Sequence, residues 1–103
     1  MDYVLTEWDH DLDDEPYLIY SELDDGRREV RKVEFFRNGI CFSYGGERGN
    51  EGALSDEPFP EDLRTLTGGG EGTCAARAIT RQLFQEIWNQ AQERPDGFMG
   101  MFF

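Results

Sequence analysis

Residues 17–44 read YLIYSELDDGRREVRKVEFFRNGICFSY, and two turn signals divide them into three segments. The tripeptide DDG at 24–26 is the first signal. The dipeptide NG at 38–39 is the stronger one, because a two-residue hairpin turn requires a positive φ at both central positions. The segments between the turns are rich in Val, Ile, Phe and Tyr, which suit a pleated, half-buried surface. We therefore expect three antiparallel strands, over about residues 17–23, 28–37 and 40–45.

Two further segments extend this sheet. Residues 3–8 alternate and predict a strand, with Tyr3 and Leu5 on the face opposite to Val4, Thr6 and Trp8. Residues 74–79 predict a short strand or an extended lead-in to the segment that follows.

The segment 81–93 predicts the main helix of the chain. Its apolar residues recur at the spacing of one helical stripe, namely Leu83, Phe84, Ile87, Trp88 and Ala91. Thr80 is a suitable N-cap, and Pro95 with Gly97 would stop the helix. The expected fold is a single α+β domain over 1–103. Its antiparallel sheet, a meander, has about four or five strands, and one main C-terminal helix packs on one face.

The remaining segments have the composition of loops. Residues 45–57 and 67–73 are expected to be mobile loops, and residues 61–66 could form one or two helical turns. The tail at 97–103 holds five large apolar side chains, so it should dock on its own domain, on a second copy or on a partner.

The strand expected at 28–37 is unusually basic and has no cleanly apolar face. Strict alternation puts Glu29 and Arg31 on the face of Val33, and Lys32 and Glu34 on the other face. We expect these basic residues to pair with acids of the neighbouring strand, such as Glu22. A basic patch for phosphates is the less favoured alternative.

The charge balance is the clearest indication of function. Twenty-two acidic residues face ten basic ones, for a net charge of −12. Such a surface repels nucleic acid and anionic membranes, so neither is expected as a partner, whereas a basic protein is attracted. Solubility alone is the simpler explanation of the same charge.

No metal, cofactor or catalytic nucleophile is predicted. Cys41 and Cys74 lack the spacing of a zinc site and are expected to pack as small, reduced side chains. The N-terminus has no secretory signal and no segment has the length of a membrane span, so a cytoplasmic location is expected.

His10 lies among carboxylates, which raises the question of a metal or acid–base site. Asp11, Asp13, Glu15 and Glu22 fit four positions of a calcium-loop spacing, but Pro16 stands where that loop needs a glycine. A lone histidine beside acids is more often a hydrogen-bonded structural residue, and we favour that interpretation.

Two phrases of the sequence resemble a family of small, uncharacterised bacterial domains. They are W-x-H-x4-E-P-x-x-I-Y-S-E-L-D, from Trp8 to Asp24, and R-x-E-V-R-K-V-E-x-F-x-x-G, from Arg27 to Gly39. The resemblance covers about residues 3–40 and, more weakly, the helix around residues 84–89. It implies no catalytic residue. It does imply a likeness to the small acidic proteins encoded beside secreted bacterial toxins.

The first hypothesis is therefore a protein-binding module, an immunity protein that occludes the basic active-site surface of a cognate toxin, for example a nuclease. The candidate partner-binding residues are Trp8, Asp9, Asp11, Asp13, Asp14, Glu15, Tyr17 and Tyr20. Core packing is an equally good explanation of the aromatic members. The alternatives are an enzyme or small-ligand binder that uses His10 with the Arg/Glu-rich strand, and an acidic nucleic-acid mimic.

Overall fold

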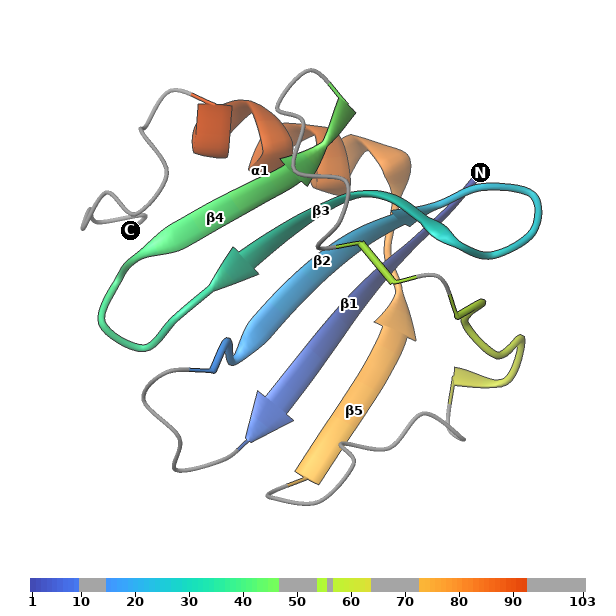
Figure 1. Cartoon of the computed structure of the whole chain (residues 1–103), viewed down its shortest axis with the longest axis horizontal. Coiled ribbons are helices and arrows are strands. Elements are labelled where there is room, and N and C mark those ends of the chain that lie inside the picture. The colour runs from blue at the N-terminus through green and yellow to red at the C-terminus, as the bar shows by residue number, and fades with distance from the viewer. Residues whose placement is uncertain (10–14, 47–53, 56, 64–72, 93–103) are drawn as a thin grey trace.

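The computed structural model describes residues 1–9, 15–46, 54–55, 57–63 and 73–92. These residues form five antiparallel strands and one helix, an α+β fold, as expected (Figure 1). The elements are β1 (Asp2–Asp9), β2 (Leu18–Leu23), β3 (Glu29–Phe35), β4 (Cys41–Gly45), β5 (Thr73–Ala78) and α1 (Arg81–Gln92). The tail at 97–103, His10 and most of the two predicted loops lie outside the described residues.

The sheet has the strand order β4-β3-β2-β1-β5. The first four strands form the expected meander, in which each strand pairs antiparallel with the next along the chain. β5 then pairs antiparallel with β1, so the ambiguous segment at 74–79 is a strand on the edge of the sheet. Residues 61–63 form no α-helix, and residues 64–66 lie outside the described part of the chain.

The β3–β4 hairpin differs from the two-residue turn expected at Asn38-Gly39. The Phe36 N–H donates to the Ile40 carbonyl at 2.9 Å, and the Gly39 N–H donates to the Phe36 carbonyl at 3.0 Å. Only Gly39 of the pair has a positive φ, at 87°. The connection is thus a three-residue loop, in which one residue in the left-handed region restores the strand pairing after a β-turn.

The β2–β3 hairpin repeats this pattern with an arginine in the left-handed position. The Arg27 N–H donates to the Asp24 carbonyl at 2.9 Å, and Arg27 itself has a φ of 62°. A positive φ is uncommon for a residue with a Cβ atom, and a glycine is the usual residue at such a position. Here the Arg27 side chain is anchored to Asp2 at 2.7 Å and to the carbonyls of Phe59 and Pro60 at 3.0 and 2.8 Å, and these bonds stabilise the turn.

A β-bulge in β3 overturns the expected alternation at one residue. Arg31 pairs with Glu22, but Glu29 pairs with Leu23, so Val30 is an extra residue without a partner on β2. The bulge moves Glu29 from the face of Arg31 to the face of Lys32. There the Glu29 carboxylate accepts a hydrogen bond from the Ser21 hydroxyl at 2.8 Å and lies 3.7 Å from Lys32.

Helix α1 covers one face of the sheet and contributes side chains to the centre of the core. Phe84, Trp88 and Ala91 are buried against Val33 and Phe35 of the sheet, and Ile87 is half-buried. Leu83, expected in the same stripe, is exposed because it lies at the border of the buried face. The predicted N-cap is confirmed, since the Thr80 hydroxyl accepts a hydrogen bond from the Leu83 N–H at 3.0 Å.

The opposite face of the sheet is contacted by the segment that follows β4. The Ser55 N–H donates to the Glu29 carboxylate at 2.7 Å, and the Phe59 N–H donates to the Arg27 carbonyl at 2.7 Å. Figure 1 shows residues 54–55 in front of the sheet and α1 behind it. Val4 and Leu23 are fully buried on this second face, so the described chain has apolar burial on both sides of the sheet.

Candidate functional site

A groove of about 810 Å³ lies at the end of the sheet where β1 ends and β2 and β5 begin. Figure 1 shows these strand ends side by side. We call this cavity the Trp8 groove. Its lining consists of Glu7, Trp8, Asp9, Tyr17, Leu18, Arg37, Cys74 and Ala75. Three of the residues expected at a binding site, Trp8, Asp9 and Tyr17, are thereby brought together.

Strand pairing positions the two aromatic residues of the groove. The Trp8 N–H donates to the Tyr17 carbonyl at 2.9 Å, and the Tyr17 N–H donates to the Phe35 carbonyl at 2.9 Å. Residues 8 and 17 flank the acidic run of the sequence and become neighbours because β1 and β2 are antiparallel. Both side chains are half-buried, which leaves part of each accessible from the groove.

The charged groups of the groove form loose pairs. Arg37 lies 3.4 Å from Asp9, and their side chains are 46% and 88% exposed. Arg77, on β5, lies 3.7 Å from Glu7, and both side chains are exposed. Exposed pairs of this kind contribute about 0–1 kcal/mol each, so a competing charge can replace either member at low cost.

The other predicted site residues do not line the groove. Tyr20 lies on the face covered by α1, where its ring packs edge-on against Phe35 at 5.7 Å. Glu15 is described and half-buried, but is not part of the lining. Asp11, Asp13 and Asp14 lie outside the described residues.

Sequence reasoning missed five lining residues, namely Glu7, Leu18, Arg37, Cys74 and Ala75. Cys74 faces the groove because β5 pairs with β1 in a register that sets it opposite Trp8. Nothing in residues 74–79 indicates which strand they join. Arg37 and Leu18 reach the groove from the β3–β4 hairpin and the start of β2, and only the assembled sheet brings them together. Burial raises the pKa of the Cys74 thiol, so the protonated thiol predominates over the thiolate at neutral pH.

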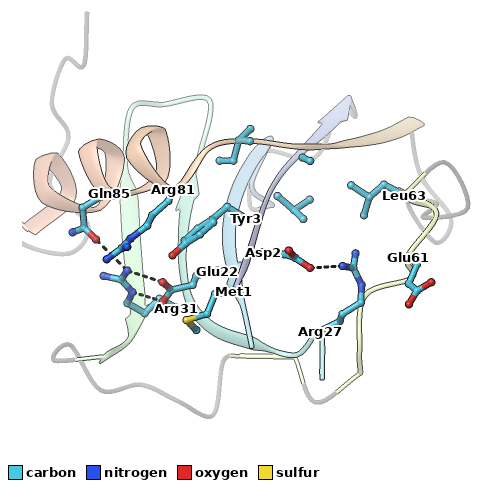
Figure 2. Close-up of a pocket in the computed structure, with 13 residues that line it drawn as sticks. Met1, Asp2, Tyr3, Glu22, Arg27, Arg31, Glu61, Leu63, Arg81 and Gln85 are labelled. Atoms are coloured by element: carbon cyan, nitrogen blue, oxygen red, sulfur yellow. Dashed lines mark hydrogen bonds and ion pairs between the residues drawn. The ribbon is translucent and has the colours of Figure 1, made fainter. Parts of the chain in front are cut away.

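A second cavity, of about 670 Å³, lies at the opposite end of β1, where α1 begins (Figure 2). We call it the Arg31 pocket. In its wall Arg31 donates two hydrogen bonds to the Glu22 carboxylate, at 2.6 and 2.9 Å, and a third to the Gln85 side chain at 3.3 Å. The Arg31 guanidinium also lies over the rings of Phe84 and Trp88, 5.0 and 4.7 Å from their centroids.

Titration in the Arg31 pocket follows from this pairing. The hydrogen bond from Arg31 is the main cause that lowers the pKa of Glu22, against the opposing effect of burial. Burial raises the pKa of Tyr3, and the hydrogen bond that its hydroxyl donates to Glu22 raises it further. At neutral pH Glu22 is therefore a carboxylate and Tyr3 a neutral phenol.

The two cavities differ in how firmly their charges are held. In the Arg31 pocket the side chains of Glu22 and Arg31 are only 8% and 19% exposed, and removing either partner would leave a buried charge. In the Trp8 groove the pairs are exposed and exchangeable. The Arg31 pocket is thus built to hold the helix on the sheet, whereas the Trp8 groove can rearrange its charges around an incoming group.

The described elements define a small α+β domain of five antiparallel strands and one helix. The chain belongs to the domain of unknown function family DUF6881, whose family model matches residues 2–93. No curated protein and no solved structure matches the chain. The resemblance to an uncharacterised domain family is therefore confirmed.

Two further observations concern the described residues alone. Within them, no three His, Cys, Asp or Glu side chains lie close enough together to hold a metal ion. Their single helix, α1, is neither long nor apolar enough to cross a bilayer.

Proposed function

We propose that this domain is an acidic protein-binding module that binds a basic protein partner at the Trp8 groove. The supporting observation is that Trp8, Tyr17, Glu7 and Asp9 line one groove, and that Asp9 directly precedes the acidic segment 10–15 in the sequence. Aromatic side chains are frequent anchors of protein interfaces, and carboxylates at the rim attract and orient a cationic surface.

The net charge supports the same conclusion. Most of the described basic residues lie in ion pairs with acids of the same chain, among them Arg27, Arg31, Lys32, Arg37 and Arg77. The basic strand is thus neutralised within the sheet and offers little to an anion. The chain as a whole keeps its charge of −12, which raises the rate of encounter with a positively charged surface.

Within this class, the partner we propose is a cognate bacterial toxin, and the mechanism is occlusion of its basic active-site surface. A nuclease is the kind of toxin that presents such a surface, because it must itself attract phosphates. The immunity protein would act in the cytoplasm of the cell that it protects. A toxin gene beside the gene of this chain is the genomic arrangement that this proposal expects.

The charge of the groove can be tested by charge reversal, with a control variant of the same net charge. Glu7→Lys with Asp9→Lys should weaken binding of the partner by about tenfold or more, because two attractive contacts become repulsive. The matched control is Glu57→Lys with Glu61→Lys, two exposed acids outside the groove, so that both double variants change the net charge from −12 to −8.

The partner would be captured from the native host with the full chain, identified by mass spectrometry, purified and titrated by calorimetry at low and high salt. We expect the control to stay close to the wild-type affinity, and the wild-type affinity to fall as salt rises. Equal weakening of both double variants, or binding that ignores salt, would contradict docking at the groove.

A small-ligand function is supported by one observation, the Arg31 pocket itself. It places Arg31 of the Arg/Glu-rich strand, with its partner Glu22 on β2, around a cavity of about 670 Å³ (Figure 2). We rank it second because those two groups already bind each other. Saturable binding of a small metabolite that shifts the Gln85 side-chain resonances, and does not shift the Trp8 indole, would reverse this ranking.

A further inference from the structure

The chain contains an internal example of how it binds a guanidinium group. Arg31 is held by a carboxylate that accepts two of its hydrogen bonds, at 2.6 and 2.9 Å, and by the faces of two aromatic rings, Phe84 and Trp88. A planar guanidinium suits such a site because it donates in a fork and stacks on aromatic rings at the same time.

The Trp8 groove offers the same chemical groups to an outside molecule. Trp8 and Tyr17 contribute aromatic surface, while Asp9 and Glu7 contribute carboxylates. The groove volume of about 810 Å³ leaves room for a further side chain. Its carboxylates therefore suit a cation, and its aromatic rings suit a flat, weakly hydrated group such as a guanidinium.

Arg37 is paired with Asp9, one of the two carboxylates of this groove, in the unbound chain. Its guanidinium lies 3.4 Å from an Asp9 oxygen, a longer contact than the 2.6 Å between Arg31 and Glu22. Asp9 is 88% exposed, so water competes for it on most sides. A loose contact of this type is easily exchanged for a better-oriented one.

We propose that the Trp8 groove receives an arginine side chain of the partner, whose guanidinium replaces that of Arg37 at Asp9. Arg37 is then a surrogate ligand, which covers Asp9 until the partner arrives. This inference rests on the proposed function, because it names the group through which a basic partner enters the groove. A lysine fits less well, since its compact ammonium keeps its water more firmly and cannot donate as a planar fork.

The test uses the full chain and three short peptides, acetyl-Gly-X-Gly-amide with X as arginine, lysine or citrulline. Citrulline keeps the planar shape of arginine without its charge. Binding is followed by ¹⁵N NMR at the indole N–H of Trp8, and the indole of the buried Trp88 is the internal reference. We expect the arginine peptide to shift the Trp8 signal saturably, and to bind about threefold or more tightly than the lysine peptide. The citrulline peptide should not bind.

Two variants probe the exchange itself. Arg37→Gln should tighten binding of the arginine peptide by about two- to fivefold, because the internal competitor is lost. Asp9→Asn should weaken it by a similar factor. A citrulline peptide that binds as well as the arginine peptide, or an Arg37→Gln variant with unchanged affinity, would overturn the inference.

Alkylation of Cys74 separates this inference from the proposed function. Cys74 is half-buried in the groove lining, whereas Cys41 is buried in the core and serves as the unreactive control. If the purified partner protects Cys74 from iodoacetamide but the arginine peptide fails to bind, the inference of an arginine in the groove is wrong, whereas docking of the partner at the groove is supported. If the partner leaves Cys74 alkylation unchanged, docking at the groove fails, and the inference fails with it.

Discussion

Replacing Arg31 with alanine should lower the free energy of unfolding by about 3–5 kcal/mol, the usual cost of breaking a buried ion pair by removing one partner. The Glu22 carboxylate, 8% exposed, would lose both hydrogen bonds from Arg31 and remain buried as an unpaired charge. The substitution also removes the guanidinium that lies over Phe84 and Trp88, and so weakens the contact of α1 with the sheet. Urea unfolding followed by tryptophan fluorescence would measure the loss.

The matched control for this prediction is Arg77→Ala. Arg77 also pairs with a glutamate across neighbouring strands, but both side chains are exposed, and the expected cost is under about 1 kcal/mol. A double variant, Arg31→Met with Glu22→Gln, should recover part of the stability because it leaves no buried charge. Equal losses in Arg31→Ala and Arg77→Ala would show that burial of the ion pair does not determine its contribution to the free energy of unfolding.

The pH dependence of stability provides an independent check on the same pair. The folded-state pKa of Glu22 is lowered, chiefly by the hydrogen bond from Arg31. Its contribution is therefore fully present above the unfolded glutamate pKa of about 4.3, and it is lost as the pH falls through the lower folded pKa. The wild-type chain should lose this contribution in acid. In Arg31→Met the acid-induced loss should be smaller, because the substitution removes the main cause that lowers the pKa of Glu22.

The sequence predicted the sheet well because its signals are local. Alternation and turn residues lie within each segment, so β1 to β4 were expected close to their observed bounds. The partner of β5 could not be predicted, because the segment at 73–78 is mostly small side chains without a distinctive pattern. That pairing brings Cys74 and Ala75 to the Trp8 groove, two of the lining residues that sequence reasoning missed.

Two details of the backbone were not predicted from the sequence, because each depends on contacts between distant parts of the chain. Arg27 takes a left-handed conformation that the turn signal at 24–26 does not indicate, because Asp2 and the carbonyls of residues 59 and 60 hold its side chain. Glu29 changes face because Val30 bulges out of the β2 pairing. The expectation that basic residues of this strand pair with acids such as Glu22 is, in contrast, confirmed for Arg31, which lies opposite Glu22 in the strand pairing.

Gly45→Ala should lower the free energy of unfolding by roughly 3–5 kcal/mol, from backbone strain and steric overlap together. Gly45 has a φ of 87°, in the left-handed region that side chains with a Cβ disfavour. A Cβ at this position would lie 2.2 Å from the Val30 carbonyl oxygen and 3.1 Å from its carbon. Val30 is the bulged residue of β3, so the β3–β4 pairing depends on a residue without a side chain here.

Gly26→Ala is the control that separates crowding from the mere loss of a glycine. Gly26 lies in the β2–β3 turn without a positive φ, and its added Cβ would meet only the flexible Arg28 guanidinium at 3.2 Å and an Asp24 oxygen at 3.4 Å. Its stability should stay within about 1 kcal/mol of the wild-type value, with a gain possible from the stiffer unfolded chain. Thermal unfolding of both variants beside the wild type would compare them. A Gly45→Ala protein as stable as Gly26→Ala would mean that the Val30 bulge can move aside, and that β4 does not require the glycine.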